Sequence, residues 1–330
     1  MINEQELCLR VKDLHTNFYT DRGVLRAVRG VDFHVIRGEM LGIVGESGCG
    51  KSVTAFSILN QVKHPGKIDA GEVWFHDTDI LKLNRSEMRK LRGSSMSMIF
   101  QEPLTALNPA FTIGWQIAES YKIQGERNKK VIREKTIDML NRVRLPEPKL
   151  RIKEYPYQFS GGMRQRALIA LALACRPELV FADEPTTALD VTVQAEILDL
   201  LQELQAEMGM SVVLISHNLN LIGERCSRVL VFYAGKIVEE APTTELFRHP
   251  SHPYTVGLLG SLLSIKQDDG IELYTMPGEV PNMQEEINYC SFAPRCPYAT
   301  ARCFEEEPHL YQIGSGHYCS CHLFEKGETH

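Results

Sequence analysis

The sequence predicts an α/β protein built on a mostly parallel sheet, and three observations support this fold class. Short apolar runs of strand type alternate with longer stretches whose apolar residues recur at helical spacing. A glycine-rich segment, residues 45–52, joins one of these runs to a helical stretch. The composition, 43% hydrophobic and 24% charged, is that of an ordinary globular domain.

Four continuous apolar runs are predicted to be buried strands of that sheet, because strands covered by helices on both faces lack polar alternation. They are residues 40–44, 97–100, 179–182 and 212–215. Between them, residues 129–144 and 191–208 have apolar side chains at helical spacing, and Asp190 is the expected N-cap of the second helix.

The chain changes character near residue 265, where proline, glycine and acidic residues replace periodic segments. We therefore expect a large domain over residues 1–264 and a small C-terminal extension over 265–330. The extension has few apolar residues, so we expect a cross-link or a metal to hold its fold.

Charge and hydropathy exclude several classes of protein. The net charge of −6 argues against a nucleic-acid partner, which normally requires a basic surface. The longest uninterrupted apolar run, residues 167–175, is far shorter than the roughly 20 residues of a membrane-spanning helix. The N-terminus shows no export or transit pattern, so we expect the chain in the cytoplasm.

The glycine-rich segment has the pattern G-x-x-x-x-G-K-[ST] after a strand and before a helix, which predicts a site for nucleotide phosphates. Its residues are Gly45, Glu46, Ser47, Gly48, Cys49, Gly50, Lys51 and Ser52. Glycines let the backbone N–H groups point at the phosphates of ATP. Lys51 is expected to contact the β- and γ-phosphates, and Ser52 to bind Mg²⁺.

Two adjacent carboxylates end the predicted strand at 179–182. Since neighbouring side chains leave a strand end in different directions, they suit different roles. Asp183 is expected to hold Mg²⁺ through water, and Glu184 to polarise the attacking water as general base.

The segment 159–166, FSGGMRQR, resembles the signature motif of ABC ATPases. Ser160, Gly161 and Gly162 begin a helix expected to reach Cys175, and a helix N-terminus is a second anion site. The resemblance implies a RecA-like core, an antiparallel β subdomain and a helical signature subdomain. It also implies that two such domains sandwich ATP, the signature of one facing the phosphate loop of the other.

Further residues match the same family in order. The resemblance implies that Gln101 senses Mg²⁺ and the attacking water, that Asp190 belongs to the loop 187–190 at the dimer interface, and that His217 contacts the γ-phosphate. An ungapped alignment places Phe18, with Tyr19 beside it, at the adenine-stacking position. Two departures are Thr187, where serine is common, and Asn218, where aspartate is usual.

Two C-terminal segments, 252–259 and 290–299, resemble the end of bacterial dipeptide and oligopeptide importer ATPases. This resemblance implies three kinds of partner: a second ABC ATPase subunit, either a paralogue or another copy of the chain, two permease subunits and an extracytoplasmic peptide-binding protein. It also implies a peripheral position on the cytoplasmic face of the membrane.

Five cysteines lie close together in the extension: Cys290, Cys296, Cys303, Cys319 and Cys321. Their spacing is wider than the C-x2-C to C-x4-C pairs common in zinc sites. Relatives in the peptide-importer group bind a [4Fe-4S] cluster here, and such a cluster takes four thiolates. We expect Cys290, Cys296, Cys303 and Cys321 as ligands, with Cys319 as the alternative fourth; zinc and unligated thiols remain alternatives.

Two other functions share some of these motifs. A soluble ABC ATPase acting on ribosomes or DNA would have every nucleotide motif, but usually also has two cassettes in one chain or a basic surface. An iron-sulfur electron carrier would need a further redox site, and no such motif is present in the sequence.

Overall fold

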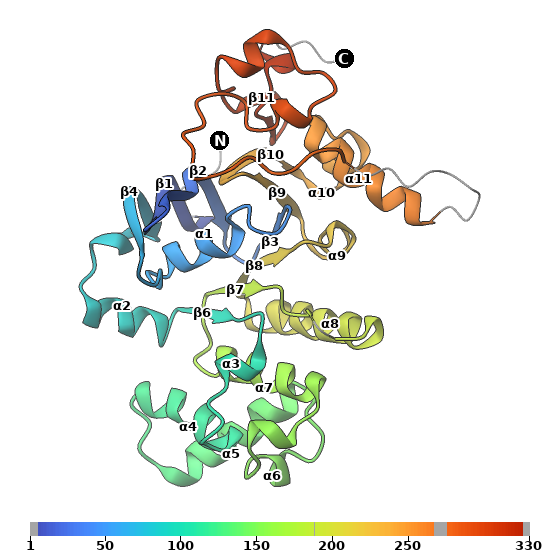
Figure 1. Ribbon diagram of the computed structural model, residues 1–330. Helices are drawn as coiled ribbons and strands as arrows, with labels where there is room; N and C mark the ends of the chain where they lie inside the picture. The colour runs from blue at the N-terminus through green and yellow to red at the C-terminus, as the bar shows by residue number, and fades with distance from the viewer. Residues whose placement is uncertain (1–5, 188, 267–275, 326–330) are drawn as a thin grey trace. The chain divides into compact units, whose positions relative to one another are not determined.

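The computed structural model describes residues 6–187, 189–266 and 276–325 (Figure 1). The chain forms two compact units, each assembled from separate stretches of sequence. The first unit comprises residues 1–8, 35–39 and 82–214, and the second comprises 9–34, 40–81 and 215–330. Each unit is described by itself below.

The first unit consists mainly of helices beside a few strands. Its sheet has the strand order β8-β7-β6, and β6 and β7 are parallel with Met96 opposite Leu179. Its elements are α2 (Arg85–Arg92), β6 (Met96–Ile99), α3 (Pro103–Ala106), α4 (Ile113–Ile123), α5 (Lys129–Arg142), α6 (Pro148–Arg151), α7 (Gly161–Leu173), β7 (Leu179–Asp183), α8 (Val191–Met208) and β8 (Ser211–Ser216).

Local sequence signals set the ends of the long helices in this unit. The Asp190 carboxylate accepts from the N–H of Val193 at 3.0 Å and begins α8, which confirms the predicted N-cap. Gly209, with φ 66°, ends the helix in the left-handed region. The predicted helix at 191–208 is confirmed, whereas α5 ends at Arg142, two residues before the predicted end.

The second unit contains two sheets. A smaller antiparallel sheet has the order β2-β1-β4-β5, and the strands β3, β9, β10, β12 and β11 lie side by side in the other. The elements are β1 (Leu7–Thr20), β2 (Gly23–Ile36), β3 (Met40–Val44), α1 (Lys51–Ile58), β4 (Gly66–Phe75), β5 (Thr78–Asp79), α9 (Leu219–Arg225), β9 (Arg228–Tyr233), β10 (Lys236–Pro242), α10 (Thr243–Arg248), α11 (Pro253–Lys266), β11 (Tyr311–Gly314) and β12 (His317–Cys319).

The C-terminal residues continue the sheet of the second unit. β12 pairs antiparallel with β10, Cys319 lying opposite Glu239, and β11 pairs with β12. Helix α11 runs through the expected boundary between residues 264 and 265, and residues 267–275 lie outside the described part of the chain. The division into domains 1–264 and 265–330 stays a prediction.

A buried carboxylate joins three parts of this unit. Glu239 on β10 is fully buried, and its oxygens accept from the N–H groups of Ser251 and His252, at 2.8 and 2.9 Å. His317 Nε2 on β12 lies 2.8 Å from the same carboxylate. Because a buried charge is tolerated only when it is paired, these contacts fix the turn before α11 and the start of β12.

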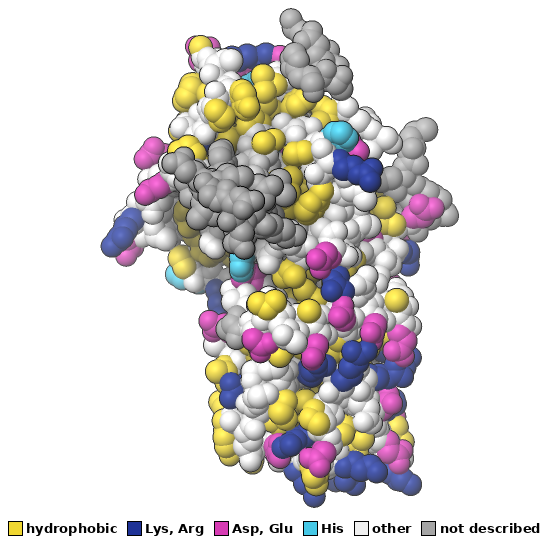
Figure 2. Space-filling model, turned by 90° about the vertical axis from the view of Figure 1, so that its right-hand side faces the viewer, with side chains coloured by type: hydrophobic (Ala, Val, Ile, Leu, Met, Phe, Trp, Pro, Cys, Tyr) yellow, Lys and Arg dark blue, Asp and Glu magenta, His cyan; other side chains and the backbone are white. Residues whose placement is uncertain are grey.

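Ion pairs on the outer face of the first unit connect its helices. Arg142, the last residue of α5, pairs with Glu207 on α8, and Arg144, just after the helix, pairs with Glu203. Arg166 on α7 pairs with Glu196 on α8 at 2.8 Å. Figure 2 shows acidic and basic side chains intermingled over this part of the surface. The most exposed of these pairs, between Arg144 and Glu203, contributes little to stability.

Within the described ranges, every helix is too short or too polar to cross a lipid bilayer.

Candidate functional site

The glycine-rich segment forms a tight loop between β3 and α1 in the second unit. Gly45 has φ 151°, and a Cβ added there would lie 2.2 Å from the carbonyl oxygen of Phe232. Gly50, with φ 102°, caps α1, and a Cβ there would lie 2.3 Å from the carbonyl oxygen of Ala27. Only glycine fits at these two positions, because both the dihedral angle and the neighbouring backbone exclude a side chain.

Lys51 is buried and folded back over this loop. Its Nζ donates to the carbonyl oxygens of Gly45, at 2.7 Å, and Glu46, at 2.9 Å. Ser52 follows in the first turn of α1. A loop with an inward lysine beside a helix N-terminus can bind the phosphates of a nucleotide, which would replace the two carbonyls as partners of the ammonium group.

Glu46 in the same loop contacts two residues that the sequence did not link to it. Its N–H donates to the hydroxyl of Tyr254 at 2.9 Å, and its carboxylate accepts from Arg295 Nη1 and Nη2 at 3.0 and 3.1 Å. These partners stand 208 and 249 residues away along the chain. At such separations no local pattern could reveal the contacts.

In the first unit, the structure brings Gln101 and Glu184 together. Glu184 follows the end of β7 with φ 44°, an uncommon value for a residue with a side chain. Its Oε2 accepts from Gln101 Nε2 and from Thr187 Oγ1, each at 2.9 Å. Asp183, the last residue of β7, is buried. A carboxylate oriented by two donors is suited to accept a proton from water.

The predicted signature residues form the start of α7 in the first unit. The Ser160 hydroxyl accepts from the N–H of Met163 at 3.3 Å, and Gly161 and Gly162 are the first helical residues. Ser160 and Gly161 are exposed, so an anion can reach this N-terminus. The helix ends at Leu173 and not at Cys175 as expected. Of the loop 187–190, Ala188 lies outside the described residues.

The remaining predicted nucleotide residues belong to the second unit. Phe18 lies opposite Gly66 in the β1–β4 pair, where a Cβ on the glycine would meet its ring at 2.7 Å. The Tyr19 hydroxyl donates to Asp69 Oδ2 at 2.8 Å. His217 is exposed after β8, and the next residue, Asn218, caps α9 with its side-chain oxygen. The asparagine therefore has a capping role in this unit.

A cavity of about 160 Å³ lies within the C-terminal part of the second unit, and four thiols contribute to its wall. They are Cys290, Cys296, Cys303 and Cys321. Cys319 on β12 is fully buried and is absent from that wall. Over the described ranges, no three His, Cys, Asp or Glu side chains are grouped so as to hold a metal ion as they stand.

Burial favours the protonated form of three of the cavity thiols. It raises the pKa of Cys290 and of Cys321 to about 11 each, and it raises the pKa of Cys296 as well. A metal or cluster would have to displace these protons, because thiolates are the binding form.

Family comparisons place two known regions on the chain. Residues 28–187 match the family model described as "ABC transporter". Residues 238–303 match the model described as "Oligopeptide/dipeptide transporter, C-terminal region". The second match includes Cys290, Cys296 and Cys303 of the cavity wall.

Curated relatives resemble the chain over nearly its whole length. It is 50% identical to the "Probable peptide ABC transporter ATP-binding protein y4tR" of Sinorhizobium fredii, covering 96% of this chain and 95% of the relative. It is 45% identical to the "Dipeptide transport ATP-binding protein DppD" of Escherichia coli, covering 95% of this chain and 96% of the relative.

The fold of the chain is similar to that of a solved ATP-binding cassette. The ATP-binding cassette MJ0796, a dimer bound to ADP and Pi in a post-hydrolysis state, is 27% identical with a TM-score of 0.64. The match covers 71% of this chain and 98% of that one. The fold is therefore that of an ABC-type P-loop cassette, as the sequence predicted.

Two glycines of the phosphate loop provide a matched test of its geometry. Gly48→Ala places a Cβ in open space at φ 80° and should cost only the backbone strain of about 1–2 kcal/mol. Gly45→Ala adds a clash with the Phe232 carbonyl and should lower the free energy of unfolding by clearly more. Denaturant unfolding of both variants measures the difference, and equal losses would show that the close approach at Gly45 is unimportant.

Proposed function

The chain belongs to the family of ATP-binding subunits of peptide ABC transporters, and from this membership we propose that it hydrolyses ATP to power uptake of dipeptides or oligopeptides through partner permeases. The observation that supports the proposal best is the identity of 45% to DppD of Escherichia coli over 95% of the chain. That length includes the C-terminal region as well as the cassette.

ATP is held between two ATPase subunits in this proposal. The sequence contains one phosphate loop, residues 45–52, and one signature helix start, residues 160–162. Each subunit therefore supplies Lys51 and its loop to one nucleotide and the exposed N-terminus of α7 to another. The second subunit is a paralogue or another copy of this chain.

The cassette residues then have separate tasks. Ser52, Asp183 and Gln101 hold Mg²⁺ and its water ligands, and Glu184 accepts a proton from the attacking water. Support for the last role comes from the two hydrogen bonds that orient Glu184, donated by Gln101 and Thr187. His217 contacts the γ-phosphate, Asp190 belongs to the interface loop, and Phe18 with Tyr19 forms the adenine platform.

Glu184→Gln tests the proposed base. The amide keeps the shape of the side chain but cannot accept a proton, so ATP binding should persist while the hydrolysis rate falls at least about 100-fold. An ATP-bound dimer should accumulate, measured by sedimentation with and without ATP. Glu203→Gln, the same change at an exposed position of α8, should leave turnover unchanged. Normal turnover in Glu184→Gln would reject this carboxylate as the base.

Permease subunits are proposed to dock on the first unit, in the segment 100–115 that contains Gln101. Here four large apolar side chains are exposed: Phe100, Leu104, Phe111 and Trp115. The rings of Phe111 and Trp115 stack with centroids 4.0 Å apart. A group of exposed aromatic and aliphatic side chains is typical of a protein interface. Docking there would place the chain on the cytoplasmic face of the membrane as a peripheral subunit.

Affinity purification from membranes tests both the partners and the function class. A tagged chain should co-purify with two permeases, and Trp115→Ala should lose them while keeping ATP binding. Tyr298→Ala removes a more exposed aromatic ring from the C-terminal region and should keep the permeases. Recovery with ribosomes or DNA in place of permeases would favour the alternative, a soluble ABC ATPase.

We also propose that the cysteine-lined cavity holds a [4Fe-4S] cluster. Four thiols around one cavity fit the ligand set of such a cluster, and Cys290, Cys296, Cys303 and Cys321 would be its ligands. When bound, the cluster would cross-link the C-terminal region through four iron–sulfur bonds. Zinc is the alternative occupant, since thiolates also bind this ion.

Metal analysis of two cysteine variants tests this assignment. Protein purified without oxygen should be brown and contain about four irons per chain. Cys321→Ser should lose most of the iron, whereas Cys319→Ser, a change outside the cavity wall, should retain it. Colourless protein with one zinc per chain would contradict the cluster. Loss of iron only in Cys319→Ser would show that Cys319, and not Cys321, is the fourth ligand.

A further inference from the structure

The C-terminal region touches the phosphate loop at a point that the established ATPase chemistry does not require. We propose that Arg295, located beside the cysteine-lined cavity, is a positioning residue for the phosphate loop. It holds Glu46 in the conformation that receives ATP. Arg295 itself does not reach the nucleotide in this proposal; it acts through the loop.

The Arg295 guanidinium is held on several sides. Its side chain is 6% exposed, and its fork donates two hydrogen bonds to the Glu46 carboxylate. Nε donates to the carbonyl oxygen of Pro277 at 2.9 Å, and Nη1 donates to the hydroxyl of Tyr233 at 3.3 Å. The guanidinium carbon lies 5.8 and 5.9 Å from the ring centres of Tyr233 and Phe292. Two parallel hydrogen bonds from one guanidinium fix both the orientation of the Glu46 carboxylate and its distance from Arg295.

Glu46 is fixed at its backbone as well as at its carboxylate. Its N–H donates to the hydroxyl of Tyr254, and its carbonyl oxygen accepts from Lys51, the lysine of the loop. The ring of Tyr254 packs against Tyr233 and Phe292, at centroid distances of 4.6 and 5.6 Å. One aromatic cluster therefore supports both Arg295 and Tyr254.

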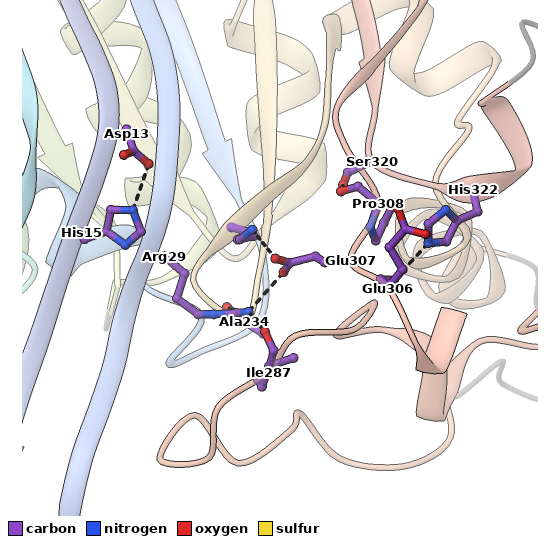
Figure 3. A network of polar contacts seen from close by, with 11 residues as sticks. Asp13, His15, Arg29, Ala234, Ile287, Glu306, Glu307, Pro308, Ser320 and His322 are labelled. Carbon is purple, nitrogen blue, oxygen red and sulfur yellow. Dashed lines mark hydrogen bonds and ion pairs between the residues drawn. The ribbon is translucent and has the colours of Figure 1, made fainter. Parts of the chain in front are cut away.

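A second polar network anchors the C-terminal region independently (Figure 3). Arg29 on β2 donates to the carbonyl oxygens of Ala234 and Ile287, at 3.1 and 2.6 Å. Glu307 lies between Arg29, at 3.1 Å, and Lys236, at 2.6 Å. Because these contacts do not involve the phosphate loop, they hold the region in place without the help of the contact between Arg295 and Glu46.

Two physical effects follow from this contact. A loop already held in one conformation loses less conformational entropy when a ligand orders it, so anchoring favours ATP binding. Pairing with Arg295 also offsets the negative charge of Glu46, which would otherwise repel the phosphates. Both effects act on binding, so loss of the contact should raise the dissociation constant for ATP more than it lowers kcat.

Three arginine variants of the full-length chain test the proposal. Arg295 and Arg302 each precede a cavity cysteine, but Arg302 pairs with Glu306 and Glu325. Arg295→Met should raise the dissociation constant for MgATP, measured by calorimetry, about tenfold while kcat changes less than about threefold. Arg302→Met should leave both within about twofold, and Arg295→Lys should be intermediate. Iron content is measured for every variant.

A double-mutant cycle with Glu46→Gln separates positioning from general damage, and Arg295→Lys replaces Arg295→Met in the cycle if the methionine variant is poorly folded. Glu46→Gln should weaken ATP binding less than Arg295→Met, because it loosens the loop but also removes the negative charge. The double variant should bind no more weakly than Arg295→Met, because both changes remove one contact. Additive losses, an unchanged dissociation constant in Arg295→Met, or equal weakening in Arg302→Met would each overturn the proposal.

Discussion

The close approach of backbone to backbone at the phosphate loop is the constraint on which the site depends. At Gly45 and Gly50 the loop passes so near the carbonyl oxygens of Phe232 and Ala27 that no side chain fits. This packing sets the curl of the loop and therefore the direction of its N–H groups. The same curl explains the position of Lys51, because its ammonium group reaches back to the loop carbonyls.

The proposed base for hydrolysis, Glu184, belongs to the first unit. There the buried strand β7 ends at Asp183, and Glu184 turns into the left-handed region with its carboxylate held by Gln101 and Thr187. The α7 N-terminus in the same unit offers N–H groups to an anion. In the proposed activity, one subunit binds the phosphates of ATP through its loop and another contacts them through its α7 N-terminus. Hydrolysis therefore requires two paired subunits.

Local patterns predicted the elements well because their causes are local. The N-cap at Asp190 and the glycine after Met208 fix α8 within a few residues of sequence. The role of Gln101 came only from family resemblance, since its partner Glu184 is 83 residues away. The contact between Arg295 and Glu46 was not predicted, because it depends on how the C-terminal region packs.

The choice between Cys319 and Cys321 as fourth ligand could not be made from the sequence either. Residues two apart in an extended chain face the same side, so spacing alone could not separate them. In the structure β12 ends at Cys319, which pairs with Glu239 on β10, and the chain then turns so that Cys321 reaches the cavity wall.

ATP-dependent peptide uptake in reconstituted vesicles tests the central claim most directly. The chain is assembled with its permeases, partner ATPase and peptide-binding protein, and accumulation of a labelled dipeptide or oligopeptide is followed with ATP on the cytoplasmic side. Uptake that requires ATP and falls to background when Lys51→Ala is introduced into this chain is the predicted result. Uptake that is unaffected by Lys51→Ala would contradict the account.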